Sequence, residues 1–323
     1  MPIEQASLSR PELHRAVGSF VAAAVGDALG APFEFGSPGQ YSLTYPAPVL
    51  TGVGEMTGNH LWDEGEFTDD TQMALCLAES LLACGEFDVD DVWTRWCDWA
   101  RDAKDVGITT RRSLSYVSPI EAADNAQATG SRSAANGALM RAFPIALWAI
   151  DWHIKDAMAL AVHQGSLTHH DPAAGWGAAI AVELIRRGIR GHALLDDLDL
   201  EIADVLSHVP QPERDQFAAV LSPHFDPHMH DGPSNSTVWT CLAHAVWSLR
   251  NGTSLPHTLQ LAIDLGGDTD TVACVAGALA GSVYGIQAIP SRWLAHLNGV
   301  VNLPTLEVDE RGVLQRVETK RID

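Results

Sequence analysis

The sequence predicts an all-α fold, a compact multi-helix bundle in a single domain over residues 1–323. Apolar residues recur at helical spacing through most of the chain. Patterns typical of strands are scarce, and no internal repeat, low-complexity segment or linker divides the chain. Nearly half of the residues are hydrophobic, so a chain of 323 residues can bury a large core.

Helix boundaries can be placed from local signals. The first predicted helix begins after Ser9, a good N-cap, has Pro11 just inside its start, and runs through small apolar residues to Gly30. A second predicted helix begins near Asp69 and is ended by Gly85. Further candidates are the segments "IKDAMALAVHQGSLTH", "PAAGWGAAIAVELIRRG", "STVWTCLAHAVWSLRNG" and "LPHTLQLAIDLG".

Two apolar segments need a choice between interpretations. In "DVDDVWTRWCDWARDA", Trp93, Trp96 and Trp99 fall on or near one helix face, and this stripe favours core packing over a ligand platform. In "NGALMRAFPIALWAI", Pro144 should either kink a helix or mark its true start.

The segment "DLGGDTDTVACVAGALAGSVYG" predicts a central helix. Its residues Ala273, Gly277 and Gly281 recur every four positions, so they form a strip of small residues that another backbone can approach closely.

The C-terminal extension 300–323 is the only segment with a clear strand pattern. It contains "TLEVDERGVLQRVE", a pattern typical of one small hairpin around the turn-like "DERG".

Composition limits the partners. The formal net charge of −21 argues against nucleic acid or an anionic membrane as the main partner, because both require basic patches. The five cysteines lie in apolar helical patterns without a CxxC pair, which is typical of reduced thiols. There is no apolar signal-peptide core near the N-terminus and no uninterrupted apolar run of spanning length. We therefore expect a cytoplasmic protein, and a monomer.

Two segments about two hundred residues apart each place carboxylates and hydroxyls at the head of a predicted helix. Capping is the simplest interpretation, but a helix start needs only one capping oxygen. Four aspartates brought together would repel one another, and two divalent cations would approximately balance them. The oxygen-bearing residues are Thr68, Asp69 and Asp70 in one segment, and Asp268, Thr269, Asp270 and Thr271 in the other.

The donor chemistry indicates a hard cation. No Cys or His lies within either oxygen-rich motif, 68–70 or 268–271, so Mg²⁺ or Mn²⁺ fits and Zn²⁺ fits poorly. A separate cluster, His224, His228 and His230 in "PHFDPHMHDGP", is typical of an exposed loop because prolines surround it, and we do not expect a dedicated metal site there.

Six motifs in order along the chain resemble those of the ADP-ribosylglycohydrolases. Within that family, the motifs resemble those of the bacterial dinitrogenase-reductase-activating glycohydrolases. The resemblance is collinear from about residue 14 to 290 and does not cover the segment after about 300. The motifs are "GDALGAPFEF", "FTDDTQMAL", "VGITTRRSL", "ANGALMRAFP", "SLTHHDPAAGWGA" and "LGGDTDTVACVAGALAGSVYG".

The resemblance implies a compact all-α fold around a binuclear Mg²⁺ or Mn²⁺ centre. The two ions would hold ribose hydroxyls and position a water near the anomeric carbon, and the transition state would resemble an oxocarbenium ion. Asp69 or Asp270 would accept the water's proton, and Glu34 would act as a gate or ligand; the alternative for Glu34 is an exposed loop residue. The implied metal ligands are Thr68, Asp69, Asp70, Asp268, Asp270 and Thr271.

The resemblance also implies a nucleotide site. Ser133, Asn136 and Gly137 match the loop for the ADP-ribose diphosphate and its neighbouring ribose, where backbone N–H groups at a helix start suit a phosphate. Ala135 departs from the pattern, because relatives often have Gly there, and Ala would be strained if the position needs a positive φ. His169 matches a histidine near the diphosphate; the alternative is a helix-end histidine that binds carbonyl groups.

The resemblance also implies where the acceptor binds, that is, the protein side chain that carries the ADP-ribose. The residues lie in the loop before "ITTRR". Asp105 and Gly107 would face the modified side chain, and an aspartate can bind a guanidinium through two hydrogen bonds. The alternative for Asp105 is a solvated loop charge. The implied function is removal of ADP-ribose from a protein substrate, with arginine linkages favoured. Alternatives are hydrolysis of serine- or other O-linked ADP-ribose, a metal-dependent phosphohydrolase, and a non-catalytic ADP-ribose binder, which the complete ligand set disfavours.

Overall fold

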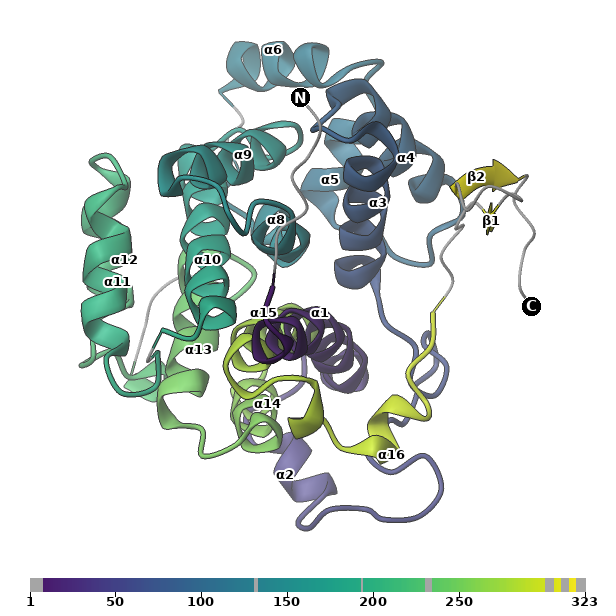
Figure 1. Cartoon of the computed structure of the whole chain (residues 1–323), viewed down its shortest axis with the longest axis vertical. Coiled ribbons are helices and arrows are strands. Elements are labelled where there is room, and N and C mark those ends of the chain that lie inside the picture. Colours follow the sequence, from purple (N-terminus) through teal and green to yellow (C-terminus); the bar gives the residue numbers. More distant parts are fainter. Residues whose placement is uncertain are drawn as a thin grey trace.

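The chain folds as the all-α protein that the sequence predicts (Figure 1). The computed structural model describes residues 8–130, 133–192, 194–229 and 234–299, and the backbone of 305–308 and 314–317. The α-helices run as α1 Arg10–Gly30, α2 Gln40–Thr44, α3 Asp69–Cys84, α4 Val89–Asp102, α5 Ile108–Leu114, α6 Pro119–Thr129, α7 Gly137–Met140, α8 Phe143–Trp148, α9 Ile154–Ser166, α10 Pro172–Arg190, α11 Leu198–Ser207, α12 Glu213–Val220, α13 Val238–Asn251, α14 Leu255–Asp264, α15 Thr269–Tyr284 and α16 Ser291–Leu294. Short 3-10 helices cover Ala31–Phe33, Pro227–Met229 and Ile286–Ala288.

Helices α1 and α15 lie side by side at the centre of the molecule, although they come from opposite ends of the sequence (Figure 1). Helices α10, α13 and α14 pack against this pair, and α3 and α8 pack above it as the figure is drawn. As predicted, Ser9 caps α1, because its side chain accepts a hydrogen bond from the backbone N–H of Glu12.

The contact between α1 and α15 is made backbone to backbone. A Cβ atom added to Gly26 would lie 2.0 Å from the carbonyl oxygen of Ala273, and one added to Gly277 would lie 2.1 Å from that of Ala22. A Cβ on Gly281 would come equally close to Gly18. The predicted strip of small residues is therefore confirmed, and only glycine fits at these crossing points.

The central position of α1 accounts for an apolar segment. By length and composition, Arg10–Phe33 is apolar enough to cross a membrane, although Asp27 interrupts its apolar run, as the expectation of no uninterrupted run of spanning length requires. Most of this segment is buried inside the protein, against α15. Its small apolar residues are those that a core helix needs for close packing.

The other predicted elements are present. Trp93 and Trp96 are buried in the core, and the indole N–H of Trp99 donates a hydrogen bond to Gln72, so the tryptophan stripe serves packing. Pro144 lies in the first turn of α8 and marks a helix start. At the C-terminus, β1 (Thr305–Val308) pairs antiparallel with β2 (Leu314–Val317), which is the predicted hairpin.

The close contact makes a stability prediction. We expect Gly277→Ala to lower the free energy of unfolding by at least about 1–3 kcal/mol, because the added methyl group would overlap backbone atoms of α1 that cannot move aside separately. Chemical denaturation measures this. Gly107→Ala is the matched control, because its added Cβ would meet no atom within 4 Å. Equal stability of the two variants would contradict the close contact.

Candidate metal centre and substrate site

The heads of α3 and α15 meet in the folded protein. The hydroxyl of Thr271 lies 3.4 Å from the Oδ2 atom of Asp70, and the hydroxyl of Thr68 lies 3.5 Å from the same oxygen. Asp268 is also close enough to Asp69 to raise the pKa of its carboxyl group. The two oxygen-rich segments, two hundred residues apart, therefore form one site, as the sequence predicts.

The residues at the two N-cap positions do not cap their own helices, and only Asp270 accepts from an N–H of its own first turn, that of Thr271. The N-cap residues Thr68 of α3 and Asp268 of α15 make no side-chain capping hydrogen bond. Capping, the simplest interpretation of the two segments, therefore does not explain why they are rich in oxygen. Their side chains remain available for another task.

Asp27 of α1 provides the cap that α3 lacks. Its Oδ1 atom accepts from the backbone N–H of Thr68 at 2.9 Å, and its Oδ2 atom accepts from the N–H and the hydroxyl of Thr71 at 3.0 and 2.5 Å. Sequence reasoning missed this residue. A signal was present, because a single carboxylate in the apolar run of α1 would be buried, and a buried charge needs partners.

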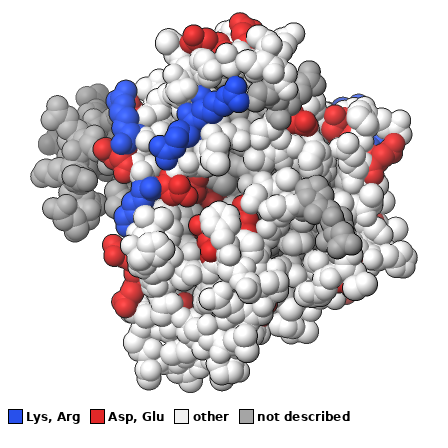
Figure 2. Space-filling model, turned by 180° about the vertical axis from the view of Figure 1, so that it is seen from behind, with Lys and Arg blue, Asp and Glu red and all other residues white. Residues whose placement is uncertain are grey.

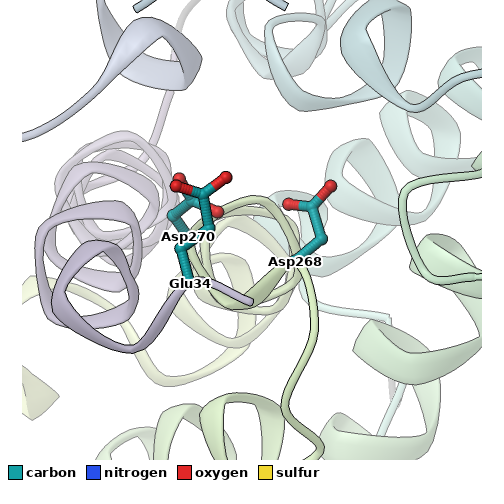
Figure 3. Close-up of side chains that lie close together, drawn as sticks. All are labelled: Glu34, Asp268 and Asp270. Atoms are coloured by element: carbon teal, nitrogen blue, oxygen red, sulfur yellow. The ribbon is translucent and has the colours of Figure 1, made fainter. Parts of the chain in front are cut away.

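Glu34 joins the aspartates of α15 because two backbone contacts hold its loop against the head of that helix. Phe35 donates a hydrogen bond to the carbonyl of Gly267 at 2.6 Å, and Gly36 pairs with Gly267 in an isolated antiparallel bridge. One oxygen each of Glu34, Asp268 and Asp270 lies within 4.8 Å of the others, and Figure 3 shows these carboxylates side by side.

Burial and mutual repulsion oppose ionisation of this cluster. Burial is the main cause that raises the pKa of Asp27 from 3.8 to about 6. Burial, followed by the charge of Asp268, raises the pKa of Glu34 from 4.5 to about 7. The carboxyl pKa values of three other residues are raised well above 3.8 by burial first and by neighbouring carboxylates second. These three are Asp69, Asp70 and Asp270.

The cluster fits a divalent cation. The Oδ1 atom of Asp70 is buried and has no hydrogen-bond partner among the described residues, although a buried carboxylate oxygen normally has one. The oxygens around it come from carboxylates and hydroxyls, which hard cations prefer. A bound cation would both satisfy this oxygen and remove the repulsion between the carboxylates.

Two asparagines hold Asp268. The Oδ1 atom of Asn235 accepts from the backbone N–H of Asp268 at 3.0 Å, and its Nδ2 atom donates to the carbonyl of Gly266 at 2.8 Å. The Nδ2 atom of Asn136 donates to Oδ2 of Asp268 at 3.0 Å. Sequence reasoning missed Asn235, which lies outside the recognised motifs. It placed Asn136 in the nucleotide loop, and the structure shows that its amide N–H also joins this loop to the acidic cluster.

The predicted acceptor loop reaches the same cluster. The backbone N–H of Gly107 lies 3.4 Å from Oδ2 of Asp69. Asp105 is close enough to raise the pKa values of both Asp69 and Glu34. Asp105 is half-buried, and its Oδ1 atom accepts from the N–H of Val106. Asp105 therefore lies beside the acidic cluster, and its role toward the acceptor stays a prediction.

The predicted nucleotide residues also lie together. The hydroxyl of Ser133 is 2.9 Å from that of Thr109 on α5. Gly137 begins α7 and packs against the ring of His169, where an added Cβ would lie 2.9 Å from the ring. His169 is buried and its Nδ1 atom contacts the hydroxyl of Thr168, so it does not bind helix-end carbonyl groups.

The departure at Ala135 does not strain the loop. Ala135 forms an antiparallel bridge with Thr237, and the only described non-glycine residue with a positive φ is Phe35, at 58°.

The histidine cluster of "PHFDPHMHDGP" is not part of this site. His224 and His228 are exposed, and His230 lies outside the described residues.

Charged side chains are unevenly spread over one face of the molecule. Figure 2 shows acidic side chains near the middle of that face, with Lys and Arg side chains beside and above them.

The fold and the site define a class: an all-α hydrolase-type protein with a buried carboxylate cluster beside a nucleotide-type loop. The family model described as ADP-ribosylglycohydrolase matches residues 9–321. The chain therefore belongs to the ADP-ribosylglycohydrolase family and is an enzyme of the glycohydrolase class. The match extends beyond the motif-bearing segment at both ends.

Individual relatives agree. The chain is 31% identical over 294 residues to ADP-ribosyl-[dinitrogen reductase] glycohydrolase of Rhodospirillum rubrum, covering 90% of this chain and 93% of the relative. It is 28% identical to ADP-ribosylarginine hydrolase Tri1 of Serratia proteamaculans, covering 88% and 75%. The solved structure of an ADP-ribosylglycohydrolase-related protein complex superposes with a TM-score of 0.70 at 32% identity, covering 90% and 94%.

The raised pKa values predict how stability depends on pH. A carboxyl group with a higher pKa in the folded than in the unfolded protein binds its proton more tightly when folded. Its contribution to stability is fully present below the unfolded pKa, about 4, and is lost as pH rises through the folded pKa. The folded pKa is about 6 for Asp27 and about 7 for Glu34, so their contributions to stability are lost between about pH 4 and these values. In EDTA, we therefore expect a lower melting temperature at pH 7.5 than at pH 5.

Excess MgCl₂ should raise the melting temperature at pH 7.5, because a cation that binds only the folded cluster stabilises it. NaCl at equal ionic strength is the control for screening. Identical melting curves in EDTA, NaCl and MgCl₂ at pH 7.5 would show that the cluster binds no Mg²⁺.

Proposed function

We propose that this protein is a metal-dependent hydrolase that removes ADP-ribose from arginine side chains of modified proteins. The observation that carries the proposal is the meeting of two distant oxygen-rich helix heads in one buried cluster, beside the acceptor and nucleotide loops. Membership of the ADP-ribosylglycohydrolase family supports the reaction class. The names of two relatives, an ADP-ribosylarginine hydrolase and an ADP-ribosyl-[dinitrogen reductase] glycohydrolase, support a protein substrate and an arginine linkage.

Two Mg²⁺ or Mn²⁺ ions are proposed as the cofactors. When bound, they would supply Lewis-acid and template chemistry at the ribose hydroxyls and the attacking water. Four aspartates and two ions of charge +2 would be approximately neutral together. Glu34 lies against the same cluster and is placed to complete it. The proposed ligands are Thr68, Asp69, Asp70, Asp268, Asp270 and Thr271.

The chain's carboxylates would move the protons. Hydrolysis breaks the bond between the anomeric carbon and the guanidinium nitrogen, and water adds its oxygen to that carbon. One water proton would go to a carboxylate oxygen of Asp69, Asp270 or Glu34, and the same carboxyl group would pass that proton to the leaving nitrogen, so that no net proton is needed.

Asp105 would bind the acceptor. A carboxylate can hold a guanidinium by two parallel hydrogen bonds, and each charged hydrogen bond contributes about 1.5–3 kcal/mol. A serine linkage offers no such cation, so Asp105 would favour arginine linkages. The close approach of Asp105 to Asp69 would place that guanidinium next to the carboxylates that act on the glycosidic bond.

The central test uses two substrates. Peptides with arginine-linked or serine-linked ADP-ribose are incubated with the enzyme in MgCl₂ or in EDTA, and free ADP-ribose is measured. We expect release from the arginine peptide in MgCl₂ only. Asp268→Asn and Asp270→Asn should abolish release, because each removes a proposed ligand charge. Full turnover in EDTA would exclude metal catalysis, and release from the serine peptide alone would exclude the arginine linkage.

The role of Asp105 has its own test. We expect Asp105→Ala to slow release from the arginine peptide by roughly ten- to a hundredfold, the rate equivalent of losing about 1.5–3 kcal/mol of charged hydrogen bonding. Calorimetry should show nearly unchanged affinity for free ADP-ribose, which has no guanidinium. Asp102→Ala removes an exposed carboxylate three residues away and should leave the rate unchanged. If Asp105→Ala weakens cleavage of both peptides equally, Asp105 does not select the acceptor.

A further inference from the structure

Arg141 is a buried cation with neutral partners. It is fully buried, its guanidinium lies 3.9 Å from the ring centre of Trp96, and its Nε atom donates to Oε1 of Gln164 at 3.0 Å. Among the described residues, no ion pair includes Arg141. Burial lowers its pKa to about 9, so it stays charged at neutral pH. The carboxylate of Asp69 is near enough to oppose this lowering, but the direct hydrogen-bond partners of Arg141 are all neutral.

One of its hydrogen bonds leads to the nucleotide site. The Nη2 atom of Arg141 donates to the hydroxyl oxygen of Thr168 at 2.7 Å, and this oxygen lies 2.8 Å from Nδ1 of His169. A guanidinium has donors only, so the hydroxyl must accept from Arg141. The hydroxyl proton then needs an acceptor of its own, and Nδ1 of His169 is the one that the described residues offer.

The opposite arrangement would be unfavourable. If Nδ1 carried a proton, the Thr168 hydroxyl would face two donors and its own proton would have no acceptor. Thr168 is completely buried, and an unpaired buried donor costs about 1–3 kcal/mol. An imidazolium ion is also disfavoured, because burial first, and then Arg141 and His170, hold the pKa of His169 well below its ordinary value. A neutral ring that accepts at Nδ1 carries its proton on Nε2.

The Nε2 atom is directed at the nucleotide loop. A Cβ added to Gly137 would lie 3.0 Å from it, and a longer side chain there would cover it. Nε2 makes no hydrogen bond to another described residue, so its N–H has no partner within the described protein. His169 also lines a cavity of about 440 Å³, whose other lining residues lie on α6, on α9 and at the start of α10 and do not belong to the nucleotide loop.

We propose that Arg141 acts through Thr168 to hold His169 in its neutral Nε2–H tautomer, so that His169 donates a hydrogen bond to an anionic ligand oxygen of the phosphate class. His169 would then be neither a metal ligand nor a proton acceptor, because both roles need a free lone pair on Nε2. Arg141 and Thr168 are positioning residues and do not touch the ligand. Only the identity of that ligand, the diphosphate of ADP-ribose, rests on the proposed function.

The tautomer is tested on the ligand-free protein. Nitrogen-15 NMR of histidine-labelled protein shows which ring nitrogen carries the proton, and His169→Gln assigns the signals by their loss. We expect the Nε2–H tautomer alone in the wild type and in Thr168→Ser, which keeps the hydroxyl. Thr168→Val has nearly the same shape without the hydroxyl, and we expect a mixture of tautomers. A wild-type Nδ1–H tautomer, or an unchanged tautomer in Thr168→Val, would overturn the proposal.

Calorimetry then tests the donor role. We expect Thr168→Val to weaken ADP-ribose binding roughly tenfold, as for loss of a hydrogen bond to a charged group, and Thr168→Ser to leave it unchanged. Equal weakening by both variants would overturn the role of the hydroxyl. A wild-type protein that has the Nε2–H tautomer but binds no ADP-ribose would support the tautomer and count against the proposed function, so the two failures are distinguishable.

Discussion

The close backbone contact between α1 and α15 is the constraint on which the site depends. Two helices approach to the distance seen here only where glycine replaces larger side chains, as at Gly26 and Gly277. The contact continues to the helix ends, where the hydroxyl of Thr269 donates to the carbonyl of Gly30. The chain that leaves α1 is thereby held against the head of α15, and Glu34 arrives beside Asp270. A site assembled from residues about two hundred positions apart thus takes its accuracy from a contact in which glycines let two helix backbones meet directly.

The same contact brings several carboxylates close together. The charge of one of them, Asp27, is stabilised in part by the hydrogen bonds it accepts. Asp27 caps α3 from the neighbouring helix, so the oxygens of Thr68 and Asp70 need not serve that helix. The remaining carboxylates repel one another. Two unit charges 4 Å apart interact by about 4 kcal/mol at an effective dielectric constant of 20, so several such pairs cannot all stay ionised without a cation. The buried, unpartnered oxygen of Asp70 marks the place where this balance is incomplete in the protein alone.

The sequence predicts those parts of this structure that depend on local patterns. Helix starts at Ser9 and Asp69, the glycine strip and the oxygen-rich helix heads all follow from residue type and spacing. The residues that hold the site in place do not. Asp27 and Asn235 act on backbone groups tens of residues away, and no periodicity reveals such a partner. The sequence around Arg141 predicts only an apolar helical segment, and it does not reveal that this arginine is buried or which residues it contacts. Long-range hydrogen bonds are set by tertiary packing, and a single sequence does not display it.

The site as a whole is divided between two kinds of polar chemistry. Its acidic half would repel any anion, whereas the half around His169 offers neutral donors backed by the buried charge of Arg141. The proposed ligand has the same division, with a neutral, hydroxyl-rich ribose at one end and a diphosphate in the middle. Only one orientation places the phosphates away from the carboxylates. Asn136 joins the halves, because its amide binds Asp268 while its backbone belongs to the nucleotide loop. The link through Asn136 would fix the distance between the two halves, and that distance would set which glycosidic bond lies over Asp69 and Asp270. The same link would therefore determine both the orientation of the ligand and the bond that is hydrolysed.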